Sequence, residues 1–474
     1  MTAAKNIHQR RASPNEQRTI SREDLGHYYA VIVGAVYELE GDFNLAAPET
    51  FYPALSQCVQ QEPWLCVVVG DAHTEKAFFE RIPTLDFKNH VTILGPSEKD
   101  ADDLTLIQET LEADVDRPFS KGCPPWRVVI QPLEAENQIF VAFSFSHTIG
   151  DGMTGPIFHR TFARGLNETT AGTKLADYQI AKSCTKPLPG PFDTPERLPI
   201  SWSFLLGPLL GEILPKFILD FLGFKASLAR YDEGTWTATP VFFNAETYKT
   251  QVRVVEIEPV VIERAVRAAR EHEAKLTGVI HPLMARALSK SLPDKHITNF
   301  VSQTAINMRR SVGVPGDEMG EFASGCYSKT ARSEAEGPLT PEEWANAKEI
   351  TEQLALSASE LKDHAISLLR YAPNIRQWMA GKVGKPRDCS VEMSNLGLVD
   401  ADAAAGSNVV TKKMIFTQPG HVAGPPVTCN TVTLKGGSLM VTMTWQTGAL
   451  GIEGDEGAFI DKVCADLKSG FDLL

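Results

Sequence analysis

The chain is poor in positive charge and in paired cysteines. Its 474 residues carry 46 Lys and Arg against 59 Asp and Glu, which gives a formal net charge of −13. Because a net negative surface repels phosphate backbones, we expect no nucleic-acid partner. None of the eight cysteines stands in a CxxC pair, so the sequence predicts reduced thiols, most of which fill the core.

The chain also lacks an apolar segment that could cross a membrane. Residues 1–17 are polar, so we expect no signal peptide. The longest apolar stretch, 201–224, contains two prolines and three charged residues, and this composition excludes a transmembrane helix. Two interpretations of it stay open: an inter-domain segment packed on the core, or a surface segment that touches a membrane or an apolar substrate. We expect a cytoplasmic protein, either free or peripheral on an internal membrane.

Length and composition are those of a globular protein with two domains. Hydrophobic residues make up 43% and charged residues 22% of the chain. Segment 186–199 holds five prolines, which cannot lie inside a helix or a central strand. We therefore expect an N-terminal domain over 1–185, a proline-rich and apolar crossover over 186–235, and a C-terminal domain over 236–474. No heptad seam is present, so we expect a monomer.

Each half mixes strands and helices, so the predicted fold class is mixed α/β. Apolar and β-branched runs predict strands at 26–39, 63–70, 126–133, 138–147, 250–258 and 297–310. Helical spacing predicts helices at 47–61, 154–167 (with Thr154 near the cap), 259–275, and from a cap at Thr277 to about Leu292, with a late start or a kink at Pro282. A two-residue turn at Gly436 and Gly437 predicts a C-terminal hairpin.

The most informative stretch is FSFSHTIGDGMTGPIF, residues 143–158. Side chains alternate along a strand, so His147 ends an apolar row and points the same way as that row. Partial shielding from water there favours the neutral imidazole. A neutral histidine at a strand end is the right type of group for a general base. A purely structural histidine is the alternative.

Two glycines decide how the following residues fold. Gly150 and Gly152 disfavour a helix, so His147 and Asp151 are not expected to be i,i+4 partners. This argues against a metal site, and we expect none. It also argues against a hydrolase triad in which Asp151 orients His147, and no GxSxG motif occurs in the chain. We expect Asp151 to fix the turn through backbone N–H groups or an arginine.

The string from His147 to Gly152 matches the HxxxDG motif of the chloramphenicol-acetyltransferase-like superfamily. The segments INMRR (306–310), MGEFASG (319–325) and MSNLG (393–397) follow in order. Together they resemble the fungal alcohol acetyltransferase branch, and the likeness covers most of the chain. Two related branches fit less well. Condensation domains carry a second histidine where this chain has Ser146, and the DFGWG motif of plant BAHD enzymes is missing.

The resemblance implies two similar domains, each a mixed sheet flanked by helices, with a tunnel between them. It implies acyl transfer, here of an acetyl group, from acyl-CoA to a small-molecule hydroxyl, in secondary metabolism and without a permanently bound cofactor. By this resemblance His147 would deprotonate the hydroxyl, while Asp151 would be structural and paired with Arg309. An N-acyltransferase, a carrier-protein-dependent enzyme and a non-catalytic binding module stay open as alternatives.

Two further groups of residues are candidates on the same basis. Donors for the oxyanion are the Gly152 N–H or the polar side chains of the later motifs, namely Ser394, Asn395, Thr417 and Gln418. Ordinary turn hydrogen bonding is the alternative for these side chains. Basic residues that could hold the phosphates of CoA are Lys382, Lys385, Arg387, Lys412 and Lys413. Solvated loop charges are the alternative there.

Overall fold

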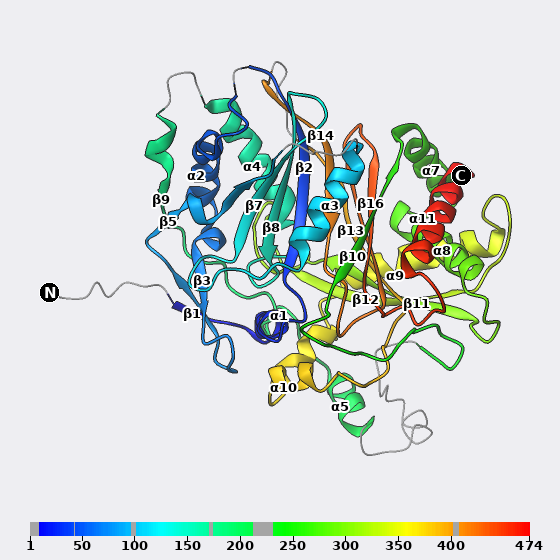
Figure 1. Ribbon diagram of the computed structural model, residues 1–474. Coiled ribbons are helices and arrows are strands. Elements are labelled where there is room, and N and C mark those ends of the chain that lie inside the picture. The colour runs from blue at the N-terminus through cyan, green and yellow to red at the C-terminus, as the bar shows by residue number, and fades with distance from the viewer. Residues whose placement is uncertain (1–8, 42, 96–100, 170–173, 212–230, 402–406) are drawn as a thin grey trace.

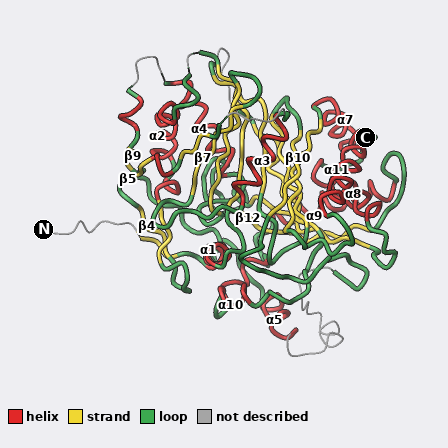
Figure 2. The backbone as a smooth tube through the Cα atoms, in the orientation of Figure 1, coloured by secondary structure: helices red, strands yellow, loops and turns green. Residues whose placement is uncertain are grey.

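Two β-sheets lie side by side at the centre of the molecule, with helices on their outer sides (Figure 1). The computed structural model describes residues 9–41, 43–95, 101–169, 174–211, 231–401 and 407–474. In Figure 2 the strands of both sheets form a continuous central band between two groups of helices. This arrangement confirms the predicted mixed α/β class.

The first sheet has five strands in the order β14-β2-β8-β7-β6. Their bounds are β14 Val409–Thr417, β2 Ala30–Leu39, β8 Gln138–Ser146, β7 Trp126–Pro132 and β6 Val91–Ile93. Helices α2 (Tyr52–Gln61) and α4 (Thr154–Glu168) cover its outer face (Figure 1). The Phe143 ring stacks on that of Phe158 from α4 at 3.8 Å between centroids, so burial on this face explains the apolar row of β8.

The second sheet has six strands in the order β10-β16-β15-β13-β11-β12. Their bounds are β10 Thr250–Ile257, β16 Leu439–Gln446, β15 Val427–Leu434, β13 Val391–Val399, β11 Asn299–Asn307 and β12 Ala323–Ala331. Four long helices lie on its other side (Figure 1): α7 Pro259–Glu271, α8 Leu276–Ser291, α9 Pro341–Ser359 and α11 Glu456–Asp472.

Smaller elements complete the described chain. Two small sheets, β1-β4-β3 and β5-β9, comprise β1 Gln9–Arg11, β3 Val67–Gly70, β4 Phe78–Arg81, β5 Thr84–Asp86 and β9 Ile180–Lys182. The remaining helices are α1 Pro14–Asp24, α3 Asp103–Val115, α5 Trp202–Gly211 and α10 Ile375–Ala380. Short 3₁₀ helices span Pro48–Phe51, Pro63–Cys66, Phe87–Asn89, Leu175–Tyr178 and Ala365–Tyr371.

Strand β14 ties the two parts of the chain together. Although it comes from the second half of the sequence, it pairs antiparallel with β2, and Ile415 lies opposite Gly34. The Thr442 hydroxyl of β16 donates to the Phe416 carbonyl of β14 at 2.6 Å. The chain thus returns to the first sheet after building most of the second. The division at residues 186–235 stays a prediction.

Several predicted boundaries were wrong. The strand predicted from residue 63 begins at Val67, because the proline at 63 opens a 3₁₀ turn. Helix α8 begins at Leu276 with Lys275 at its cap, so Thr277 is not the cap, and Pro282 lies inside a helix that continues to Ser291.

Of two local predictions near turns, one was confirmed and one was inexact. Thr154, expected near the cap of α4, is its first helical residue, directly after Met153 at the cap. The C-terminal hairpin exists, but its strands end at Leu434 and begin again at Leu439, so the turn is longer than two residues. Gly436 adopts a φ of 76°, which suits glycine there.

The apolar stretch 201–224 is described only in its first part. Helix α5 exposes 78% of Trp202, whereas Phe204 and Leu205 are half-buried. Residues 212–224 lie outside the described residues, so contact of this stretch with a membrane stays a prediction. Among the described helices, none is both long and apolar enough to cross a bilayer.

The cysteines follow the sequence prediction. All eight are free thiols, and all but Cys123 are buried. Burial raises the pKa of the Cys429 thiol, and the same cause acts on Cys58 and Cys389. These thiols therefore stay protonated and fill the core.

His159 on α4 makes stability depend on pH. Its Nδ1 lies 2.8 Å from the Tyr37 hydroxyl and its Nε2 lies 2.8 Å from the Val33 carbonyl oxygen. Burial lowers its pKa from 6.5 to about 4. The unfolded chain therefore binds a proton first as the pH falls, and the stability that His159 contributes is present above pH 6.5 and lost towards pH 4.

We expect His159→Gln to flatten this dependence. Between pH 7 and pH 5 the wild-type free energy of unfolding should fall by about 2 kcal/mol more than that of the variant. Urea unfolding of both proteins at the two pH values measures the difference. An equal loss of unfolding free energy in the two proteins would show that His159 does not cause this pH dependence.

Candidate active site

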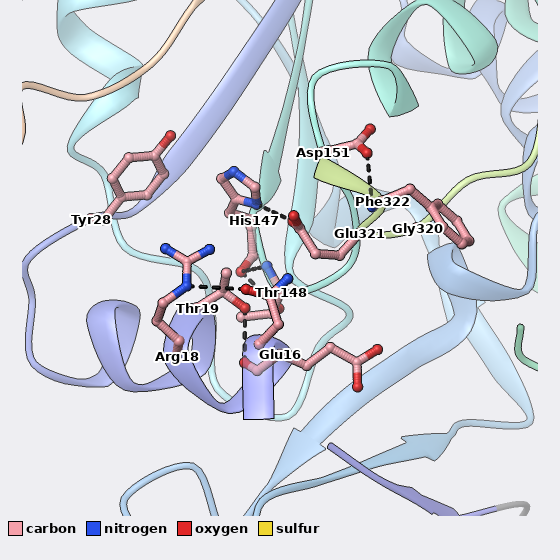
Figure 3. Close-up of polar contacts among 12 residues, drawn as sticks. Glu16, Arg18, Thr19, Tyr28, His147, Thr148, Asp151, Gly320, Glu321 and Phe322 are labelled. Atoms are coloured by element: carbon pink, nitrogen blue, oxygen red, sulfur yellow. Dashed lines mark hydrogen bonds and ion pairs between the residues drawn. The ribbon is translucent and has the colours of Figure 1, made fainter. Parts of the chain in front are cut away.

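The HxxxDG segment forms the corner between β8 and α4. Ser146 ends β8 and its hydroxyl donates to the Glu23 carboxylate, while the Thr148 N–H donates to Ser146 Oγ at 3.1 Å. The Asp151 carbonyl then accepts from the Thr154 N–H at 2.9 Å. These bonds turn the chain sharply after the strand. His147 and Asp151 consequently point to different partners (Figure 3).

His147 faces a carboxylate from the other sheet. Its Nδ1 lies 2.6 Å from Oε2 of Glu321, two residues before β12 (Figure 3). The Glu321 side chain is only 3% exposed. Burial alone would raise the pKa of this carboxyl, but the His147 imidazole and the arginines of α1 outweigh burial and lower it. Because Nδ1 lies against this carboxylate, Nε2 is the ring nitrogen left for another molecule.

Asp151 is held by Arg309, the arginine that the sequence analysis pairs with it. The Arg309 guanidinium donates two parallel hydrogen bonds to the Asp151 carboxylate, at 2.7 and 2.9 Å. The carboxylate also accepts from the backbone N–H groups of Phe322 at 2.9 Å and Met153 at 3.0 Å. Arg309 is 1% exposed and donates further to the Glu318 and Gly320 carbonyls.

The Asp151–Arg309 ion pair positions Glu321, the carboxylate that faces His147. Glu321 lies between Gly320, whose carbonyl accepts from the Asp151 N–H, and Phe322, whose N–H donates to the Asp151 carboxylate. The motif aspartate therefore fixes the segment that carries Glu321 and does not contact the imidazole itself. Removing either charge would leave the other buried without its partner.

A cavity of about 220 Å³ opens beside His147. It is lined from both sheets and from α1, and its polar lining includes His147, Glu321, Gln418, His421, Glu392 and Lys382. A cavity where a histidine–carboxylate pair meets other polar groups has the composition of a small-molecule site.

A second histidine–carboxylate pair lies in the same cavity. His421 Nε2 is 3.2 Å from Oε2 of Glu392 on β13. Burial alone would raise the pKa of Glu392, but His421 and nearby donors lower it to about 2. The Tyr28 ring lies between the two histidines, 5.7 Å from the His147 ring and 5.5 Å from the His421 ring.

The candidate oxyanion donors have different positions. Gln418 lines the cavity, but its amide donates to Asn430 and Glu392 and its oxygen accepts from Tyr28. Asn395 donates to Thr277 on α8 and lines a different pocket. Ser394 and Thr417 are buried and do not line the cavity. Gly152 packs against Leu396 so closely that a Cβ would lie 2.6 Å from its methyl group.

The candidate phosphate-binding residues also lie in different places. Lys382 lines the His147 cavity, and exposed Lys385 lines an adjoining pocket that shares Lys382 with it. Arg387 is buried and donates to the carbonyls of Thr239, His421, Val422 and Gly424, but its second terminal nitrogen has no hydrogen-bond partner and it lines the pocket of Lys385, so its assignment to phosphate stays a prediction. Lys412 and Lys413 form ion pairs with Glu38 and Glu256 on β2 and β10.

Sequence reasoning missed Glu321, His421, Glu392 and the cavity face of α1. Glu321 is part of the motif MGEFASG, which the sequence analysis quotes for the resemblance, so its segment was a usable signal. His421 and Glu392 gave no signal, because they lie far apart in the sequence and meet only in the tertiary structure, where Glu392 is on β13 and His421 precedes its parallel neighbour β15.

The alcohol acetyltransferase family model matches residues 105–469 of the chain. The chain belongs to the alcohol acetyltransferase family. A curated relative of this acetyltransferase, the probable alcohol acetyltransferase FCK4 of Fusarium pseudograminearum, is 24% identical over 85% of this chain and 83% of its own. The probable alcohol acetyltransferase crmB of Aspergillus fumigatus is 20% identical over 92% of this chain and 94% of its own.

Solved structures show that the acetyltransferase has the chloramphenicol-acetyltransferase-like fold. The trichothecene 15-O-acetyltransferase TRI3 from Fusarium sporotrichioides aligns over 99% of this chain and 96% of its own, with a TM-score of 0.66 and 11% identity. The condensation domain of the monacolin K polyketide synthase MokA aligns over 98% of both chains, with a TM-score of 0.60 and 13% identity.

We expect the Asp151–Arg309 pair to be essential for stability. Asp151→Ala and Arg309→Ala should each lower the free energy of unfolding of the acetyltransferase by about 3–5 kcal/mol, because each leaves a buried charge unpaired. The double variant should lose much less than the sum. Denaturant unfolding of the three variants measures this, with the exposed neighbour Arg310→Ala as control. Additive losses would contradict the pairing.

Proposed function

We propose that this chain transfers an acetyl group from acetyl-CoA to a hydroxyl group of a small molecule, with His147 as general base. The observation that carries the proposal is the His147–Glu321 pair at the wall of a cavity between the two sheets. Membership of the alcohol acetyltransferase family supports the reaction class, and the likeness to a trichothecene 15-O-acetyltransferase supports an acceptor from secondary metabolism.

The reaction needs one proton acceptor. Glu321 holds the proton of the imidazole on Nδ1, so Nε2 accepts the proton of the acceptor hydroxyl. The alcohol oxygen attacks the thioester carbonyl directly, and the tetrahedral intermediate collapses to ester and coenzyme A thiolate. The imidazolium returns its proton to the thiolate, so free coenzyme A leaves and His147 is neutral again. No enzyme residue is acylated.

Positions for the co-substrate follow from the two adjoining pockets. Lys385 and Arg387 of the adjoining pocket are our candidates to meet the phosphates of CoA, and Lys382, which lines both pockets, would then face the pantetheine arm. Gly152 N–H is the remaining oxyanion donor of those considered, because the amide of Gln418 is already engaged. Asp151 keeps its structural role through Arg309.

We expect purified wild type to form acetyl esters from acetyl-CoA and at least one member of a panel of alcohols, from short aliphatics to hydroxylated terpenoids and polyketides. His147→Ala should cut turnover by about 10²–10⁴-fold, the usual share of a general base, without loss of folding. Mass spectrometry of the esters measures this, with exposed His296→Ala as control.

Each negative result of this experiment has a different meaning. Ester formation that survives in His147→Ala would remove the general base but keep the reaction. No ester with any alcohol, together with binding of coenzyme A, would point to an amine acceptor or a longer acyl donor. Neither ester nor binding would favour a carrier-protein donor or a non-catalytic binding module.

Glu321 should act as a positioning residue. Glu321→Gln keeps the side-chain size but removes the carboxylate that faces Nδ1, so kcat should fall by about 10²-fold or more. The KM for acetyl-CoA and the thermal midpoint should change little. Half-buried Glu318→Gln, three positions away, is the matched control. An unchanged kcat in Glu321→Gln would contradict the positioning role.

A further inference from the structure

Helix α1 places two arginines of like charge at the wall of the cavity. Arg18 and Arg22 are four residues apart on α1 and both line the cavity beside His147. Like charges at this spacing repel one another and weaken a helix. In Figure 3 the guanidinium of Arg18 reaches from α1 towards the space between Tyr28 and His147.

Both guanidinium groups lack an ionic partner. Arg22 is 9% exposed, and its Nε is buried without a hydrogen-bond partner. It lies over the Tyr28 ring with its central carbon 4.3 Å from the ring centre. Arg18 donates through Nε to the Asn15 side chain at 3.1 Å. Within the part of the chain that the structure describes, no carboxylate lies within ion-pair distance of either guanidinium.

The carboxylates of the cavity face other groups. Glu321 pairs with His147 and Glu392 pairs with His421, while Asp388 accepts from the Tyr327 hydroxyl at 3.4 Å. The arginines act on the two glutamates only at longer range, where they help to lower the pKa of both carboxyl groups. Apart from the bond of Arg18 Nε to Asn15, their directional N–H donors are left for a ligand, and a buried donor without an acceptor costs free energy.

We propose that Arg18 and Arg22 bind a carboxylate on the acceptor, so that the acceptor of this enzyme is a hydroxy acid. The inference rests on the proposed acetyl transfer, since it names the substrate class of that site. A planar guanidinium donates to a carboxylate through two parallel hydrogen bonds, and a pair of guanidinium groups can surround it. The carboxylate at the arginines then fixes the acceptor while its hydroxyl meets Nε2 of His147.

The position of the arginines favours the acceptor over the phosphates of CoA. The Tyr28 ring lies 5.7 Å from the His147 ring and 4.3 Å from the guanidinium carbon of Arg22. The distance from the guanidinium carbon of Arg22 to the centre of the His147 ring therefore cannot exceed the sum of these two distances. The phosphates of CoA are separated from its sulfur by the whole pantetheine arm with its two amide groups. When the thioester is at His147, the phosphates of CoA therefore lie further from the imidazole than the guanidinium of Arg22 does.

Matched acceptors test the proposal. Lactate, mandelate and 4-(hydroxymethyl)benzoate are each compared with their methyl esters, in binding by calorimetry and in acetylation with acetyl-CoA. Wild type should prefer at least one free acid over its methyl ester. Arg22→Gln and Arg18→Gln should each weaken binding and kcat/KM for that acid by roughly 10- to 150-fold. The methyl ester should change little.

The control variant is Arg376→Gln. Arg376 lies where α10 meets α1 and pairs with Asp24, but it does not line the cavity. It should leave the preference for the acid unchanged. Thermal midpoints of all variants separate a loss of binding from a loss of folding.

The outcomes distinguish this inference from the proposed function. Neutral alcohols acetylated as well as every acid, or no measurable binding of any acid, would overturn the carboxylate site and leave acetyl transfer standing. Acids that bind through the arginines without ester formation would support the site and oppose acetyl transfer. A rise in KM for acetyl-CoA in Arg22→Gln, equal for acids and esters, would assign the arginines to CoA and overturn the proposal.

Discussion

The buried ion pair between Arg309 and Asp151 is the interaction on which the site depends. It joins the corner after β8 to the segment before β12, so it connects the two sheets at the point where the cavity forms. Its two charges lie inside the protein and satisfy each other together with backbone N–H and carbonyl groups. Such a pair is costly to break, because each charge would be left without solvent. It therefore fixes where Glu321 stands.

The proposed chemistry depends on two residues of one short motif that have different partners. His147 and Asp151 are four residues apart, but the glycine-containing turn sends them to different partners. One carboxylate, Glu321, faces the imidazole, while the other, Asp151, holds the backbone on either side of Glu321. Neither half of the chain contains the complete arrangement. The site exists only where the first sheet, the second sheet and α1 meet.

The cavity is lined by several charged groups. Two histidine–glutamate pairs flank the Tyr28 ring, and two arginines of α1 approach it without ionic partners of their own. Burying this many charged groups disfavours folding unless each is paired or hydrogen-bonded. Glu321 and Glu392 each have a histidine within ion-pair distance. Among the described residues, neither arginine has a carboxylate partner, and a ligand that supplies oxygen acceptors would pair with them.

The sequence alone determined the mixed α/β class, the strand that carries the HxxxDG motif and the family. These are local properties, because alternating apolar residues make β8 and the glycines make its turn. The family resemblance also pointed to Arg309 as the partner of Asp151, and the structure pairs the two. Only the tertiary structure decided that Glu321 faces His147 and that His421 and Glu392 share the cavity. Contacts between distant segments depend on sheet order and register, which include the crossing of β14 to the first sheet.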